Sequence, residues 1–281
     1  MTEIIRQAVI VSDLHSGCRF GLCPPRVSLD EGGAYTPSKL QKKVWGMWEE
    51  FWGEWVPKVT RGEPWALVIN GDAMDGVHHG VNTLISSNLA DQKRIAYECL
   101  KPHCEDAAVV YFVRGTEAHA GASGENEEKL AESLGCKQNS EGRFSRFELR
   151  LKIGHALVDI QHHTAVCGAA AYETTALQRT FVMACEEAGR WGYEAPDIVV
   201  RSHRHRMAET RVPTRNAYGI SMTTCGWQLK SPLVYRMAGA QMAMPQIGGS
   251  LVRCGDEESY ARHYVRTISR SSIERPTYEQ P

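Results

Sequence analysis

Five short polar clusters divide this chain, and each of them lies just after an apolar run. The clusters consist mainly of carboxylates and imidazoles, which suit hard or borderline divalent metal ions as ligands. Loops at strand ends bring residues that are distant in the sequence to one edge of a sheet. The sequence therefore predicts a metal site built from all five. The clusters are Asp13-Leu14-His15, Gly71-Asp72-Ala73-Met74-Asp75, Gly115-Thr116-Glu117-Ala118-His119, His162-His163 and Ser202-His203-Arg204-His205.

The hydrophobic pattern predicts an α/β fold. Apolar and alternating segments predict strands at 4–11, 65–70, 107–113, 144–151, 156–160, 197–200, 212–213, 217–224 and 260–268. Apolar residues at spacings of three and four predict helices over 40–59, 82–105, 124–134 and 169–189. Because strands and helices alternate early and hairpins follow later, we expect two mixed β-sheets that pack together and are flanked by helices.

The length of 281 residues is enough for one large domain with a well-buried core. We expect residues 1–281 to form a single domain, because the clusters run from Asp13 to His205 and a division must leave that block whole. Residues 16–65 are expected to be a loop and helix insertion near the site, since long ordered loops are often functional. The polar residues 269–281 are expected to be a frayed tail.

Composition narrows the class of protein. The net charge of -1 argues against a general nucleic-acid-coating protein, although a nuclease with a local basic groove remains compatible with it. The nine cysteines include no tight C-x-x-C pair, which predicts free thiols in a reducing cytoplasm. The first residues lack the apolar core of a signal peptide, and no segment reaches the length of a membrane span. We expect a cytoplasmic protein with no membrane partner.

Three further segments have more than one interpretation or an unusual charge. The predicted helix 40–59 carries an aromatic stripe, which either packs on the sheet or forms a platform on which bases stack. The run Glu125-Asn126-Glu127-Glu128 is predicted to be a solvated first helical turn that the helix dipole favours. The pair His78-His79 is predicted to lie in a surface loop, with lining of the pocket as the alternative.

The order Asp-x-His, Gly-Asp-x-x-Asp, a Gly-led polar turn, His, and His-x-His resembles the calcineurin-like metallophosphoesterase superfamily. The resemblance implies a four-layer αββα sandwich and two divalent metal ions, Mn²⁺ first, with Fe, Zn²⁺ or Ni²⁺ as alternatives. It implies that Asp72 bridges the two ions and that Asp75 orients His15. The implied ligands are Asp13, His15 and His205 for the first ion, and His203 with either His162 or His163 for the second.

The third cluster departs from the family pattern, which is normally Gly-Asn-His followed by an acid. Thr116 stands at the position of the Asn and Glu117 at the position of the His. Thr116, Glu117 or neither of them is then a ligand of the second ion, and His119 takes the role of general acid or is structural. The arrangement Gly-Thr-x-x-His resembles a variant found in phage-type and bacterial phosphoesterases.

The resemblance implies a phosphoesterase in which a metal-bridging hydroxide attacks phosphorus. We expect a phosphodiester substrate from nucleic acid or a nucleotide, with Arg114 and Arg204 available to bind its phosphate. A small-molecule phosphomonoesterase is the first alternative. A non-catalytic metal-binding or interaction module on the same fold is the second. A basic, aromatic-lined groove would favour the nuclease, and a closed pocket would favour the small substrate. The oligomeric state is not predicted.

Overall fold

The computed structural model describes residues 4–78, 80, 82–164, 170–215, 217–232, 234, 244–268 and 275–277. Within these residues the main strands form a six-stranded and a five-stranded sheet. The six-stranded sheet has the order β13 (Ser259–Arg266), β12 (Ile247–Cys254), β1 (Gln7–Val11), β4 (Ala66–Asn70), β5 (Val109–Val113) and β6 (Ser145–Arg146). The five-stranded sheet has the order β10 (Ala208–Thr214), β11 (Ala217–Thr223), β9 (Ile198–Arg201), β8 (Ala156–Gln161) and β7 (Glu148–Ile153).

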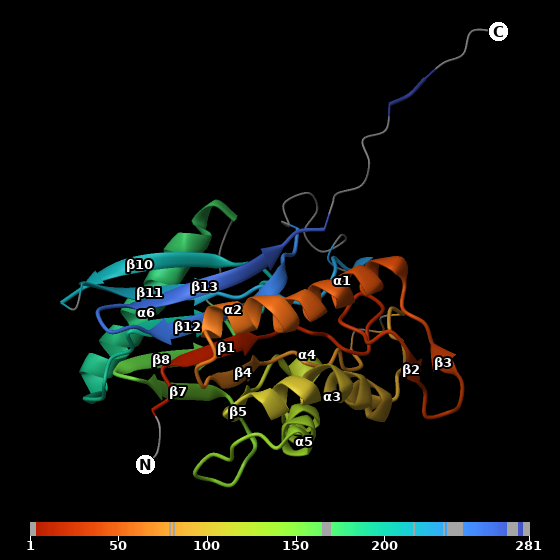
Figure 1. Cartoon of the computed structure of the whole chain (residues 1–281), viewed down its shortest axis with the longest axis horizontal. Helices are drawn as coiled ribbons and strands as arrows, with labels where there is room; N and C mark the ends of the chain where they lie inside the picture. The colour runs from red at the N-terminus through yellow and green to blue at the C-terminus, as the bar shows by residue number, and fades with distance from the viewer. Residues whose placement is uncertain are drawn as a thin grey trace.

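Helices cover the outer faces of the two stacked sheets (Figure 1). The helices are α1 (Lys39–Glu50), the π-helix η1 (Phe51–Trp55), α2 (Val56–Thr60), α3 (Leu89–Asp106), α4 (Glu117–Ala120), α5 (Glu125–Leu134), the short η2 (Ala170–Tyr172) and α6 (Glu173–Trp191). One buried core lies between the six-stranded sheet and α1, α3 and α5, and a second lies between the two sheets. A third joins α6 to the five-stranded sheet. The prediction of two packed mixed sheets flanked by helices is confirmed.

Strand direction determines where the polar clusters meet. Strands β1, β4, β5 and β6 are parallel, and so are β8, β9 and β11. The carboxyl ends of parallel strands share one edge of a sheet, and ligands bind in the crevice outside those ends in open α/β sheets. Four of the five clusters follow β1, β4, β5 and β9, and His162 follows β8. The topology therefore brings all five to the same side of the molecule.

The structure corrects several predicted boundaries. The helix predicted over 40–59 is interrupted by the π-helix Phe51–Trp55, and the insertion predicted over 16–65 also contains the short hairpin β2 (Val27–Ser28) and β3 (Ala34–Tyr35). The helix predicted from residue 82 begins only after Asn88, whose side chain accepts a hydrogen bond from the N–H of Ala90 as the N-cap. Most of the predicted tail 269–281, the residue His79 and the start of the helix predicted at 169 lie outside the described residues.

Most of the aromatic stripe packs in the core. Trp48 is 1% exposed and Trp52 is 9% exposed, and Trp48 meets the Trp227 ring edge-on at 4.6 Å. Packing on the sheet is therefore confirmed for these two residues, whereas Trp55 is half-buried. The cysteines that the structure describes are free thiols, as predicted. Among the described residues, no helix has the length and apolar character needed to cross a membrane.

Candidate metal centre

The loops that follow β1 and β4 run side by side at the carboxyl edge of the six-stranded sheet. The N–H of Asp13 donates to Gly71 O at 3.0 Å, and the N–H of His15 donates to Asp72 O at 3.0 Å. Gly71 has a φ of 78°, and a Cβ at this position would lie only 2.6 Å from His162 Nδ1. Because only glycine fits this turn without strain or collision, Gly71 allows His162 to approach Asp72.

The candidate ligands share an unusual backbone conformation. Among the described residues, seven non-glycine residues have a positive φ, and five of the seven are candidate ligands. They are Asp13 (54°), His15 (46°), Asp72 (51°), His203 (71°) and His205 (53°). The left-handed region costs an L-residue about 1–2 kcal/mol, so such residues persist only where the surrounding structure determines their conformation. Their concentration at these strand ends indicates a functional site.

Two overlapping sets of side chains converge closely enough to hold a cation each. The first set is Asp13, Asp72, His162 and His203, and the second is Asp13, His15 and His205. In the first, His162 Nε2 lies 3.0 Å from Asp72 Oδ2. In the second, His205 Nε2 lies 3.2 Å from Asp13 Oδ1. Asp13 belongs to both sets, while Asp72, to which the resemblance assigns the bridge, belongs to the first and to a further set with His15 and His119.

Two buried atoms at the centre of these sets lack hydrogen bonds. Asp13 Oδ1 and His162 Nε2 are each buried without a hydrogen-bond partner. The short distance from His162 Nε2 to Asp72 Oδ2 does not have the alignment of a hydrogen bond. An unsatisfied buried polar group costs about 1–3 kcal/mol, and a divalent cation would satisfy both atoms. A donor set of carboxylate and imidazole also matches the ligands that first-row divalent ions take. The residues present therefore fit the expected metals.

The electrostatics of the cluster separate the histidines into two protonation states. Burial, with the neighbouring His119, lowers the pKa of His15 to about 4, so this imidazole is neutral at pH 7. Burial opposes the charged form of His162 as well, but the carboxylates of Asp72 and Asp13 outweigh it and raise its pKa to about 10. A metal ligand must be neutral imidazole, so His162 has to release a proton when a cation binds.

The carboxylates themselves are held in their ionised form. Burial alone would raise the pKa of Asp13, yet the imidazoles of His205 and His162 keep it below its usual range. Burial likewise acts against ionised Asp72, and His162 and His203 hold the pKa of Asp72 well below its usual range. Two anionic carboxylates are thus present at the centre, which favours a cation there.

Hydrogen bonds on the outer side of each ring fix the direction of the inner nitrogen. His15 Nδ1 donates to Asp75 Oδ1 at 3.2 Å, and His162 Nδ1 donates to the carbonyl oxygen of Asn70 at 2.7 Å. Both rings therefore turn Nε2 toward the centre. Metal-binding histidines are commonly oriented in this way by a carboxylate or a carbonyl. The structure thus places Asp75 where it orients His15.

The third cluster contacts the candidate ligands through Thr116 and His119. The N–H of Thr116 donates to Asp72 Oδ1 at 2.7 Å, and its hydroxyl donates to the same oxygen at 3.1 Å. Glu117 is exposed at the start of α4, and it is absent from every ligand set found among the described residues. His119 packs edge-on against His15 with ring centroids 4.5 Å apart. It also belongs to a set with Asp75 and His78.

Glu127 is a site residue that the sequence interpretation missed. It is fully buried, not solvated, and its carboxylate accepts hydrogen bonds from the N–H of Ala73 at 3.0 Å and of Gly115 at 2.6 Å. It therefore ties the loop that holds Asp72 to the third cluster. Glu125 is exposed as predicted, but the prediction of a solvated turn was wrong for Glu127, because it lies three, four and seven residues before the buried Leu130, Ala131 and Leu134. That spacing places it on the buried face of α5, and it was the available signal.

The remaining predicted residues lie at the margin of the site. His163 is exposed, and its ring lies 5.8 Å from that of His203. Arg114 donates to Ser145 Oγ at 2.7 Å and pairs with Glu128 Oε2 at 3.2 Å, so its guanidinium joins α5 to the sheet. The half-buried Arg204 lies between His203 and His205 in the chain.

Comparison with known proteins gives a likeness of fold only. No family model matches the chain, and no curated protein matches it. Similar solved structures include a Vps29 complexed with zinc from Entamoeba histolytica, with 12% identity, 92% of each chain covered and a TM-score of 0.42. A predicted phosphoesterase from Streptococcus pneumoniae has 10% identity over 94% of this chain and 100% of that chain, with a TM-score of 0.33. Vacuolar Protein Sorting 29 from Cryptosporidium parvum has 10% identity over 95% and 100%, with a TM-score of 0.37.

Proposed function

We propose that this protein is a metal-dependent phosphoesterase that hydrolyses a phosphodiester of nucleic acid or a nucleotide. The observation that carries the proposal is the pair of overlapping ligand sets around Asp13, whose Oδ1 is buried without a hydrogen-bond partner. The expected cofactors are two divalent ions, most readily Mn²⁺, with Fe, Zn²⁺ or Ni²⁺ as alternatives, because Asp and His sites accept several first-row ions. Bound divalent ions supply Lewis acidity at a phosphoryl oxygen and a water of lowered pKa.

The protein's own residues orient the metal ligands, bind the substrate and supply a proton. Asp75 and Asn70 orient His15 and His162 through their outer ring nitrogens. Thr116 holds the Asp72 carboxylate with its N–H and its hydroxyl. Arg204 is a candidate for binding the substrate phosphate because of its position between two ligands. The motif order that resembles the calcineurin-like metallophosphoesterases is consistent with this division of roles.

His119 is the proposed general acid. Its Nδ1 donates a hydrogen bond to the carbonyl oxygen of Asp75, which leaves Nε2 as the nitrogen that can exchange a proton with substrate. When the ring is protonated at both nitrogens, the Nε2 proton is available to the leaving-group oxygen. An acid placed in this way contributes about 10²–10⁴-fold to the rate of a reaction with a poor leaving group.

The test uses protein stripped of metal with a chelator and then supplied with Mn²⁺. We expect hydrolysis of bis-p-nitrophenyl phosphate that depends on the metal and that falls about 10²–10³-fold in Asp72→Asn, as when one electrostatic stabiliser is removed. Asp106→Asn, an exposed aspartate at the end of α3, is the matched control and should retain activity.

Other outcomes separate the alternatives. Turnover of p-nitrophenyl phosphate alone would favour a phosphomonoesterase. Absence of turnover with Mn²⁺, Zn²⁺, Ni²⁺ and Fe²⁺, in a sample whose metal content shows the ions bound, would favour a non-catalytic module. Absence of bound metal in the same sample would contradict the metal centre itself.

A further inference from the structure

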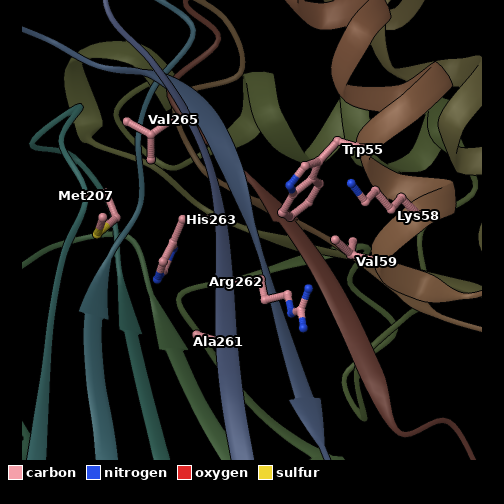
Figure 2. Close-up of a pocket in the computed structure, with 8 residues that line it drawn as sticks. All are labelled: Trp55, Lys58, Val59, Met207, Ala261, Arg262, His263 and Val265. Carbon is pink, nitrogen blue, oxygen red and sulfur yellow. The ribbon is translucent and has the colours of Figure 1, made fainter.

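A groove of about 550 Å³ runs between the helical segment η1–α2 and the edge strand β13. β13 is the last strand of the six-stranded sheet, so its outer edge has no neighbouring strand in the described part of that sheet. Figure 2 shows Trp55, Lys58 and Val59 on the helical side and Arg262 projecting from β13 toward them. The groove is thus bounded by an aromatic ring and two cations.

One wall residue of the groove is close in the chain to a candidate ligand of the metal centre. Met207, which lines the groove, lies two residues after the candidate ligand His205. The N–H of Met207 donates to Gln246 Oε1 at 2.8 Å, and the N–H of Gln246 donates to His205 O at 2.8 Å. The wall of the groove and the backbone of a candidate ligand are therefore joined through Gln246.

The aromatic side of the groove is rigid. The Trp55 ring stacks on Phe51 at 5.1 Å with an angle of 19° between the ring planes, and it meets Tyr264 edge-on at 6.1 Å. The indole is half-buried and is directed into the groove (Figure 2). A fixed, partly exposed indole is a platform on which any nucleic-acid base can stack, because every base has a π-face.

The charged side of the groove is available to an anion. Lys58 and Arg262 are exposed, and neither forms an ion pair within the residues that the structure describes. The other basic residues of β13 already have acidic partners: His263 Nε2 lies 2.9 Å from Glu209 Oε2, and Arg266 pairs with Glu50. Lys58 and Arg262 therefore give this groove a local positive charge, although the net charge of the whole protein is -1.

We propose that this groove binds a single-stranded nucleic-acid segment that extends from the metal centre, with a base on Trp55 and phosphates near Lys58 and Arg262. The inference rests on the proposed function and names its substrate as a polymer. A free strand edge can also accept an extended peptide through backbone pairing. Charged residues along an edge oppose such pairing, and the exposed Arg262 and Arg266 on β13 thus favour the nucleic acid.

Fluorescence anisotropy with a labelled single-stranded DNA dodecamer, in the presence of chelator to prevent turnover, tests the groove. We expect Lys58→Glu and Arg262→Glu each to weaken binding about fivefold or more and to reduce its dependence on salt. Trp55→Leu should weaken binding by a similar factor, and Trp55→Phe, which keeps a ring, by less. The matched control is Arg143→Glu, an exposed arginine beside β6 at the opposite edge of the same sheet, which should bind like the parent. Circular dichroism confirms that each variant is folded.

The outcomes separate this inference from the proposed function. Equal affinities of Arg262→Glu and Arg143→Glu for the dodecamer would contradict nucleic-acid binding in the groove. Failure of the parent protein to bind the dodecamer would contradict it as well. Displacement of the dodecamer by a Glu-rich peptide, when the two carry the same total concentration of negative charge, would indicate that the groove binds acidic peptides instead. The parent protein could also fail to hydrolyse bis-p-nitrophenyl phosphate with any metal, while Lys58→Glu still loses binding of the dodecamer. That result would support nucleic-acid binding in the groove and contradict the proposed enzymatic function.

Discussion

The candidate site has two parts that hold their polar side chains in different ways. At the ends of β1, β4 and β8, Asp13, Asp72 and His162 are at most 1% exposed. In the segment after β5, which includes the short helix α4, Glu117 is exposed and His119 is half-buried. Backbone strain also differs between the parts, because Asp13 and Asp72 of the first part have a positive φ, whereas no non-glycine residue of the third cluster does.

The difference indicates that the two parts of the site have different functions. A strained, buried group keeps its geometry only when the surrounding fold determines it, so the first part is suited to holding cations at fixed positions. A half-exposed residue such as His119 can contact substrate and exchange protons with it. We therefore expect substitutions in the first part to change metal content, and substitutions in the third cluster to change turnover while metal content stays constant.

The largest expected effect comes from the adjacent histidines at the end of β8. His162→Gln should lower metal affinity and diester turnover by about a hundredfold or more, since even residues that only orient ligands contribute about 10- to 100-fold. His163→Gln should stay within about threefold of the parent, as expected for an exposed position. Metal content by mass spectrometry and turnover are measured on both. Equal losses in the two variants would contradict the assignment of His162 to the centre.

The link between the two parts is Glu127, and its removal should destabilise the fold. Glu127→Ala leaves the buried N–H groups of Ala73 and Gly115 without their acceptor, which costs about 1–3 kcal/mol for each group. Urea denaturation should therefore show a free energy of unfolding lower by several kcal/mol. Glu132→Ala, at an exposed position of the same helix, is the control and should change stability by less than about 0.5 kcal/mol. Similar stabilities of the two variants would show that the link is unimportant.

The same carboxyl group gives a pH dependence. Burial and the negative charge of Asp72 raise the pKa of Glu127 from 4.5 to about 7. Between these values the folded state binds this proton and the unfolded chain does not, so the contribution of Glu127 to stability falls as the pH rises from about 4.5 to about 7. In metal-free protein, the stability of the parent relative to Glu127→Gln should be lower at pH 8 than at pH 5. A difference that is constant with pH would contradict the raised pKa.

A turnover effect without metal loss is expected at His119. His119→Gln should lower hydrolysis of a dinucleotide, whose alkoxide leaving group needs a proton, by about 10²-fold. Hydrolysis of bis-p-nitrophenyl phosphate should fall far less, because p-nitrophenolate leaves without protonation. Equal losses on the two substrates would exclude the acid role. Loss of a metal ion in His119→Gln would instead indicate that His119 is a metal ligand and belongs to the first part of the site.

The strand-end positions of the ligands were predictable because each apolar run is short and ends in a polar residue. Glu127 was harder to predict, since an acidic run after Gly124 also matches a solvated helix start, and its burial depends on how two loops approach α5. The choice between His162 and His163 was not predictable. All residues of β8 except the last are buried, so both faces of the strand are covered. Alternation of side chains along the strand therefore did not indicate which of the two histidines faces the metal centre. The π-helix Phe51–Trp55 likewise has no local sequence signal, because the aromatic packing that surrounds it is made by residues distant in the chain, such as Trp227.

The smallest expected effect is at Glu117, and it gives the sharpest test of the division. Its carboxylate is exposed and lies outside the ligand sets of the described residues, so Glu117→Gln should leave metal content and turnover within about twofold of the parent. Glu117 precedes His119 by two residues, so a change limited to turnover would mean that Glu117 affects the proton transfer, as the third cluster's role allows. Loss of one metal equivalent would have a different meaning. It would show that the loop after β5 moves when metals bind and supplies a ligand, and the two parts would then form a single metal-holding unit.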